Sequence, residues 1–212
     1  MIEKYVQAVG GREAAAKLKT RSLVGTFTGG NNQASKGEVK FAAPGKLMTT
    51  LQTTTPDGQT AEIVSATDGT TGFAKDPRGV RGLNPVQLND LKVLATVLNA
   101  VKLSDPLPKL SNGRGMRVND RPAAVVRFEQ NGINTTLLFD AETGLLVRRI
   151  DSFPTILGAI PKQYDFEDYK EVDGVKLPMT VRVYSVENNA TGVWKFTEVK
   201  HNVSLDGVKF TQ

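Results

Sequence analysis

Residues 84–103, NPVQLNDLKVLATVLNAVKL, form the one long helical pattern in a sequence that otherwise alternates as β-strands do. Their apolar side chains recur at helical spacing in two adjacent stripes, so the apolar arc is unusually wide. Asn84, Pro85 and Gln87 mark the start with a cap, a first-turn proline and a capping-box partner. A helix this apolar needs cover over most of its circumference, and the concave face of a curved sheet can provide it. We therefore predict that this helix lies across such a sheet as a plug or a lid.

Turn signals elsewhere predict an antiparallel sheet. Asn-Gly and Asp-Gly pairs are the strongest short-range hairpin signal, and they recur at 57-58, 68-69, 112-113, 131-132, 173-174 and 206-207. Hairpins join strands that follow one another, and a sheet of about ten such strands curls instead of staying flat. Two short helical patterns, Ile2–Val9 and Arg12–Lys19, precede the first strand. No linker or internal repeat divides the chain, so we predict one mainly β (α+β) domain over residues 1–212.

Composition narrows the chemistry. The chain has no cysteine, which excludes disulfides, thiolate metal sites and iron–sulfur clusters. Its net charge of +5 is spread over scattered Lys and Arg residues; this pattern argues against nucleic acid and is compatible with a generic attraction to anionic lipid headgroups. No apolar stretch reaches the roughly 18 residues of a membrane span. The opening MIEKYVQAVGG is an amphipathic helical pattern and not a signal peptide, so a targeting segment is either absent or already removed.

Several stretches, in their order along the chain, resemble one family. They are YVQAVGG with AAAKLKT, RSLVGTFT, KGEVKFAAPGK and ATDGTTGFAKD before the helix, and FDAETGLLVRR, DFEDYKEVDGVKLPMTVRV and VKHNVSLDGVKF after it. Together they resemble the outer-membrane lipoprotein-sorting (LolA/LolB-like) superfamily over nearly the whole chain. More narrowly, they are similar to its acidobacterial-type domains, some of which are attached to multihaem cytochrome subunits.

The resemblance implies a strongly curved antiparallel sheet forming an incomplete barrel of about eleven strands, with helices covering the open side. It also implies a monomeric protein of the periplasm or cell envelope, whose cavity between sheet and helices holds a lipid or an acylated lipoprotein. The lid-latching arginine of the sorting carriers matches no motif position here, and a shared fold does not by itself imply the sorting machinery.

Apolar residues of the helix and the facing strands are the candidate ligand-binding set. We expect the cavity to be lined by Leu91, Leu94, Leu98 and Val101 from the helix and by Phe27, Phe41, Leu51, Phe73, Val126 and Phe128 from the sheet. The alternative is that these residues close a dry core, as apolar stripes usually do. Ile156 and Leu157 complete the set and lie in the apolar loop Phe153–Pro161. An exposed tip of this loop would form a second gate or touch a membrane or a partner, and the alternative that we expect is a loop that folds inward as a cap on the core.

Polar clusters offer little for catalysis. Asp165, Glu167, Asp168, Glu171 and Asp173 could in principle perform acid–base chemistry or bind calcium, but we expect a solvated strand face. His201 is the only histidine and is expected at the surface. There is no G-x-S-x-G motif, cysteine nucleophile or phosphate loop. We therefore predict a protein that is not an enzyme and has no catalytic residue, metal site or cofactor.

Two functions fit these observations. The first is a periplasmic carrier or binding module that holds a lipid or lipoprotein acyl chain between the sheet and the 84–103 helix. The second is an interaction or scaffold domain that holds no ligand and docks on a larger envelope or redox assembly. A cavity beneath the helix would favour the first, and a solid interior would favour the second.

Overall fold

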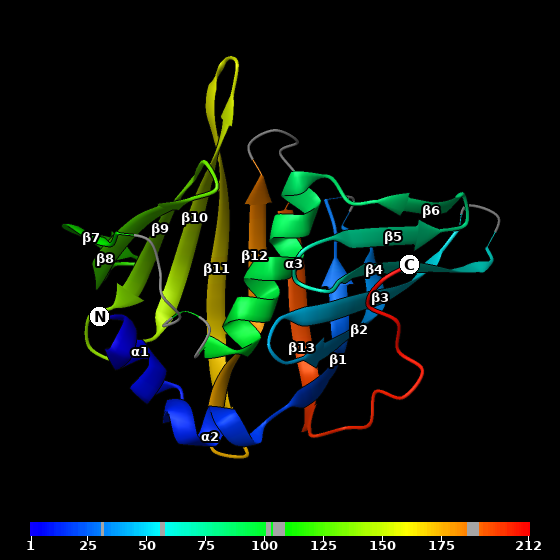
Figure 1. Ribbon diagram of the computed structural model, residues 1–212, viewed down its shortest axis with the longest axis horizontal. Coiled ribbons are helices and arrows are strands. Elements are labelled where there is room, and N and C mark those ends of the chain that lie inside the picture. The colour runs from blue at the N-terminus through cyan, green and yellow to red at the C-terminus, as the bar shows by residue number, and fades with distance from the viewer. Residues whose placement is uncertain (31, 56–57, 101–102, 104–108, 186–190) are drawn as a thin grey trace.

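Thirteen strands and three helices make up the described part of the chain (Figure 1). The computed structural model describes residues 1–30, 32–55, 58–100, 103, 109–185 and 191–212. The helices are α1 (Ile2–Ala8), α2 (Gly11–Lys17) and α3 (Pro85–Leu98). The strands are β1 (Thr20–Thr28), β2 (Ala34–Ala42), β3 (Lys46–Thr54), β4 (Thr60–Thr67), β5 (Gly72–Asp76), β6 (Gly79–Gly82), β7 (Ser111–Val118), β8 (Arg121–Gln130), β9 (Ile133–Asp140), β10 (Leu146–Thr155), β11 (Gly158–Val172), β12 (Val175–Ser185) and β13 (Thr191–His201).

All the strands belong to one antiparallel sheet with the order β6-β5-β4-β3-β2-β1-β13-β12-β11-β10-β9-β8-β7. Two meanders, β1 to β6 and β7 to β13, are therefore joined by the pairing of the first strand with the last. Strands β6 and β7 are the two edges, and α3 follows one edge and precedes the other. Because its connection must run from edge to edge, α3 crosses the face of the sheet, where it lies in front of β12 and β13 in Figure 1.

Local sequence explains where α3 begins. Asn84 Oδ1 accepts from the Gln87 amide at 2.9 Å, and Gln87 Oε1 accepts from the Asn84 amide at 3.2 Å. This reciprocal capping box, with Pro85 in the first turn, confirms the predicted start. The predicted end at residue 103 is wrong. The helix ends at Leu98, and the next residue, Asn99, has a φ of −135°, outside the range of an α-helix.

Two hairpin turns show the predicted turn chemistry. Asn131-Gly132 and Asp173-Gly174 have positive φ at both residues, which is the conformation that Asn-Gly and Asp-Gly pairs favour. The pair at 112-113 was predicted as a turn and instead lies inside β7, where the pairing with β8 shifts register. The resemblance also undercounts the strands. The residues Gly79–Gly82 show no alternation of their own, yet they pair with β5 as the edge strand β6.

The main core lies between the concave face of the sheet and helices α1 and α3. Leu23, Phe41, Leu98, Leu137 and Phe139 are at most 1% exposed there. A second, smaller cluster around Val125 and Leu138 packs on its own. None of the helices in the described ranges is long and apolar enough to cross a membrane. The sheet thus buries the C-terminal end of α3 deeply.

A cavity beneath the first part of α3

A cavity of about 1050 Å³ lies between α3 and the sheet. From the helix, its wall is formed by residues between Pro85 and Leu94, and none of the lining residues comes from the last turn, Ala95–Leu98. From the sheet, the apolar part of the wall includes Phe27, Leu51, Ile63, Val181, Val183 and Trp194. We call Pro85–Leu94 the cavity segment of α3 and Ala95–Leu98 its core segment.

Trp194 forms the floor of the cavity together with aromatic neighbours. Its ring centroid lies 5.0 Å from that of Phe27 and 5.6 Å from that of Phe196. Gly37 on β2 leaves the room for the indole, since a Cβ at that position would lie 2.4 Å from Trp194 Cζ3. Any side chain at residue 37 would therefore push this ring toward the cavity.

A buried polar network attaches the cavity segment to β9, β10 and β11. Asn89 Nδ2 donates to Asp151 Oδ2 at 2.7 Å. Asp151 is fully buried, and its Oδ1 accepts from Thr135 Oγ1 at 2.7 Å and from Arg149 Nε at 2.9 Å. The aspartate therefore has a cationic partner and two neutral donors, which is what a buried carboxylate needs.

The neighbouring helix residue makes a second set of contacts to β11. Asp90 Oδ2 accepts from Lys162 Nζ at 2.7 Å, and Asp90 Oδ1 accepts from the Tyr164 hydroxyl at 2.7 Å. Burial, reinforced by the Asp90 charge, raises the pKa of Tyr164 well above its ordinary value, so the phenol stays protonated and donates. We call Asn89, Asp90, Asp151, Lys162 and Tyr164 the polar latch. It adds hydrogen bonds and an ion pair to the apolar packing of Leu91, Val93 and Leu94 in the cavity segment. The core segment is held by apolar packing.

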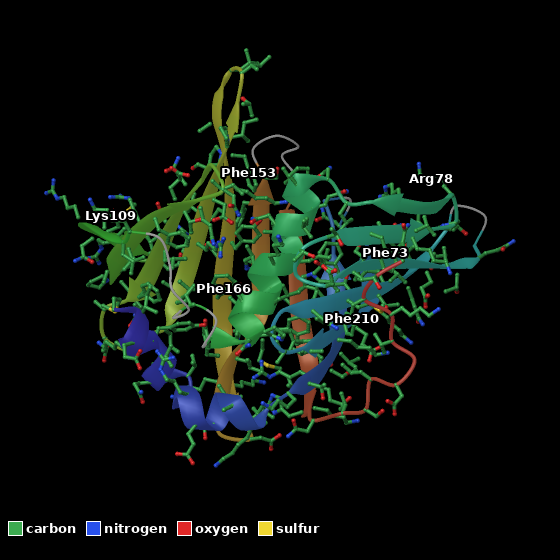
Figure 2. The ribbon with its side chains drawn as sticks, in the orientation of Figure 1. Phe73, Arg78, Lys109, Phe153, Phe166 and Phe210 are labelled. Atoms are coloured by element: carbon green, nitrogen blue, oxygen red, sulfur yellow. The ribbon has the colours of Figure 1, made fainter. Side chains whose placement is uncertain are left out.

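The structure places the predicted ligand-binding residues in different surroundings. Phe27, Leu51, Leu91 and Leu94 line the cavity. Phe41, Leu98, Val126 and Phe128 are buried in the core and do not line it. Phe73 is half-buried (Figure 2), and it does not line the cavity because its neighbour on β5, Ala74, does, and successive strand residues face opposite sides. Val101 lies outside the described residues.

Ile156 and Leu157 lie at an exposed tip, which is one of the two alternatives, and the expected inward-folded cap is wrong. The segment Phe153–Pro161 is not a loop but the end of the β10–β11 hairpin, with only Ile156 and Leu157 in the turn. Both side chains are exposed, at 101% and 94%. Phe153, Pro154 and Ile160 of the same hairpin do line the cavity, and Figure 2 shows Phe153 at this end of the sheet.

Sequence reasoning missed several wall residues. Val86 and Val93 of the helix line the cavity but are not in the predicted set, and neither are Ile63, Val183 and Trp194 of the sheet. The alternation around the only tryptophan of the chain could have indicated that Trp194 faces inward. The polar latch had no such signal, because its members come from α3 and two distant strands.

The acidic run is more structured than a solvated strand face. Asp165 is 5% exposed and binds the Arg148 guanidinium through two contacts of 2.6 and 2.7 Å. Glu167 pairs with Arg182, and Asp168, whose φ of 55° interrupts the extended strand, accepts from Thr180 Oγ1. These carboxylates have structural partners, and no cluster of potential metal ligands occurs among the described residues.

His201 is also not the expected surface residue. Its side chain is 2% exposed, and Nδ1 lies 2.9 Å from Asp173 Oδ2. Burial lowers its pKa, and the charge of the cross-strand neighbour Arg21 acts in the same direction. Arg21 is 1% exposed, and burial lowers its pKa to about 10, so it remains charged. Within the described residues, neither His201 Nε2 nor Arg21 Nε and Nη1 has a hydrogen-bond partner. These groups lie at the opposite ends of β13 and β1 from the residues that line the cavity.

Solved structures with the same fold are similar over nearly the whole chain. A domain from Vibrio parahaemolyticus that carries an outer membrane lipoprotein-sorting designation matches with a TM-score of 0.62 at 11% identity, covering 98% of this chain and 96% of the other. A LolA superfamily protein from Nitrosomonas europaea matches with a TM-score of 0.60 at 12% identity, covering 98% and 97%. A DUF1329 family protein from Desulfovibrio piger matches with a TM-score of 0.58 at 10% identity, covering 97% and 93%.

The comparisons define the class of fold. No protein-family model and no curated protein matches the sequence. At such low identities the structural likeness establishes the fold alone. The chain is thus an open, LolA-like half-barrel, mainly β, which confirms the predicted fold class with thirteen strands instead of about eleven. The narrower resemblance to acidobacterial-type domains stays a prediction.

Proposed function

We propose that this protein is a non-enzymatic carrier or binding module for a lipid or lipoprotein acyl chain, acting in the periplasm or cell envelope. The observation that carries the proposal is the apolar cavity beneath the cavity segment of α3. Its volume of about 1050 Å³ is at the upper end of the roughly 300–1,000 Å³ typical of ligand pockets. The lipoprotein-sorting designation of a protein with the same fold supports the acyl chain as the guest.

The energetics favour a guest without a polar anchor. Burying one methylene contributes about 0.8 kcal/mol, so a chain of ~12 carbons gains roughly 10 kcal/mol as an upper bound. The wall opposite α3 is built mostly from Phe, Leu, Ile, Val and Trp side chains, which suit such a chain, and Thr49 and Ser65 are small polar members of it. Asp90, Lys162 and Tyr164 of the polar latch line one side of the cavity, and the apolar side chains of the opposite wall face the guest's tail.

The two attachments of α3 suggest how the cavity admits a ligand. Release of the cavity segment breaks hydrogen bonds that water can replace, and it uncovers Leu91, Val93 and Leu94, which line the cavity and can contact a guest instead. Release of the core segment would expose Val97 and Leu98 to water with no guest to cover them. We therefore expect the cavity segment to move outward while the core segment stays packed. Contacts with the guest would offset the loss of contacts with Leu91 and Leu94.

Mass spectrometry of lipids extracted from the purified protein tests the proposal. The wild type is expected to carry an acyl lipid. Leu94→Asp places a charge in the cavity wall and should abolish the bound lipid while leaving the β-sheet signal in circular dichroism largely intact. Since Leu94 also contacts the core, Val86→Asp provides a second variant at a half-buried wall position in the first helical turn, where an acidic side chain is tolerated.

The matched control is Val80→Asp on the edge strand β6, where the valine is 52% exposed. It adds the same charge outside the cavity and should leave the bound lipid unchanged. A wild-type protein that carries no lipid and takes none up from detergent-solubilised phospholipid would contradict the carrier. The scaffold domain that docks on a larger assembly would then be the better explanation.

A further inference from the structure

The tip of the β10–β11 hairpin is the most exposed apolar feature of the described chain. Ile156 and Leu157 are the two residues of its turn, and their side chains are 101% and 94% exposed. Figure 1 shows this hairpin projecting beyond the other strands at the end where α3 begins. Large aliphatic side chains that are fully exposed at adjacent positions on a projection indicate a contact surface.

Charge is absent from the whole projecting part. The last charged residues on the two strands are Asp151 and Lys162, which are opposite each other in the register and belong to the polar latch. The residues between them, SFPTILGAIP, carry no charge. The hairpin therefore changes at the latch from a charged, buried base to an uncharged tip.

Two backbone groups of the turn form hydrogen bonds with a side chain of the hairpin. The Thr155 hydroxyl donates to the Gly158 carbonyl at 2.6 Å and accepts from the Leu157 amide at 3.2 Å. Unsatisfied backbone groups are what prevents most loops from entering the hydrocarbon region of a membrane. Here one side chain satisfies a donor and an acceptor of the turn, which lowers the cost of removing the tip from water.

The size of the tip favours a bilayer over a protein partner. A stable protein interface buries about 800 Å² on each side, and a two-residue turn on a narrow projection presents much less than that. A bilayer requires no matching surface, and a few aliphatic side chains at the interface suffice for reversible binding. The net charge of +5 adds a long-range attraction to anionic lipids.

We propose that Ile156 and Leu157 insert into the interfacial layer of a lipid bilayer and dock the protein on the membrane surface. The docked hairpin places the cavity wall formed by Phe153, Pro154 and Ile160 next to the bilayer. An acyl chain could then pass between bilayer and cavity along the apolar hairpin. Docking itself does not rest on the proposed carrier function, because a protein with an empty cavity could insert the same tip.

Co-flotation with vesicles of phosphatidylcholine and phosphatidylglycerol tests this proposal. The double substitution Ile156→Ser and Leu157→Ser is expected to lower the vesicle-bound fraction about tenfold or more, since two large aliphatic side chains leave the bilayer. Both side chains are outside the core, so the fold should be unaffected. The control replaces two other exposed apolar residues, Leu110→Ser and Met116→Ser, and should bind as the wild type does.

A site-specific label reads insertion directly. The chain has no cysteine, so Leu157→Cys gives a single position for an environment-sensitive fluorophore, with Val80→Cys as the control. Emission at residue 157 should increase and shift to the blue on vesicles, and emission at residue 80 should not. Vesicle binding that persists in the double serine variant, or a label at residue 157 that stays in water, would overturn the proposal. A variant that no longer binds vesicles but still carries extractable lipid would support the carrier function independently of docking. A protein that binds vesicles through residues 156 and 157 but carries no lipid would support docking without the carrier function.

Discussion

The two segments of α3 differ in how the sheet holds them. The cavity segment, Pro85–Leu94, borders empty space on its apolar side and is attached by the polar latch. The core segment, Ala95–Leu98, does not line this cavity, and Ala95, Val97 and Leu98 are at most 4% exposed. We call the cavity segment the cover and the core segment the anchor, because the proposed function needs the first to move outward while the second stays packed. The difference lies in the surrounding strands and also in the helix, since the latch residues Asn89 and Asp90 belong to the cavity segment.

The largest effect is expected when the anchor is weakened. Leu98→Ala removes a side chain that is 1% exposed and should lower the free energy of unfolding by about 2–5 kcal/mol. Leu91→Ala makes the same chemical change in the cavity segment and should cost clearly less, because Leu91 already faces the cavity. Chemical denaturation of both variants provides the measurement. Equal losses at the two positions would remove the distinction between anchor and cover.

A smaller effect is expected when the latch is weakened. Asp90→Ala removes the acceptor for Lys162 and Tyr164 and should cost about 1–2 kcal/mol, a modest value because Asp90 is partly exposed and water can replace some of the lost contacts. Hydrogen exchange should accelerate in the cavity segment and stay unchanged in the core segment. Glu13→Ala, which breaks the exposed Lys17–Glu13 pair on α2, is the control and should affect neither. Uniform acceleration along α3 would show that the helix moves as one unit.

The smallest effect concerns the end of the sheet opposite the cavity. Burial lowers the pKa of His201 below its ordinary value of 6.5, so below that pH the unfolded chain binds a proton that the folded chain does not. The free energy of unfolding should therefore decrease as the pH falls from about 7 to 5. His201→Gln should flatten this part of the curve. An unchanged slope in the variant would show that His201 is accessible to water and that this end is not closed.

The sequence predicted those parts of the fold that depend on local chemistry. The capping box at Asn84 fixed the start of α3, and Asn-Gly and Asp-Gly pairs located hairpins such as the one at Asn131. The strand Gly79–Gly82 could not be predicted, because its only reason to be extended is its pairing with β5. Register with a partner strand is not encoded in the strand's own four residues.

The cavity was predictable only in outline. The apolar arc of α3 is too wide to be buried against a single strand, which indicated that the helix is covered on several sides. The sequence could not show that the cavity beside the helix ends at Leu94. That boundary depends on which strands approach the helix. The latch joins Asn89 to Asp151 and Asp90 to Lys162 across distant parts of the chain, so no spacing along the sequence could reveal it. The hairpin tip was recognised as apolar, and only the pairing of β10 with β11 shows that it is exposed.

Quenching of Trp194 fluorescence tests most directly whether the space under the cavity segment accepts an acyl chain. Trp194 is the only tryptophan, is 7% exposed and lines the cavity. A fatty acid brominated along its chain should quench this emission saturably, and the unbrominated fatty acid of the same length should compete and restore it. Emission that the brominated chain leaves unchanged, or quenches only in proportion to its concentration as it would quench free tryptophan, would show that no guest reaches the cavity.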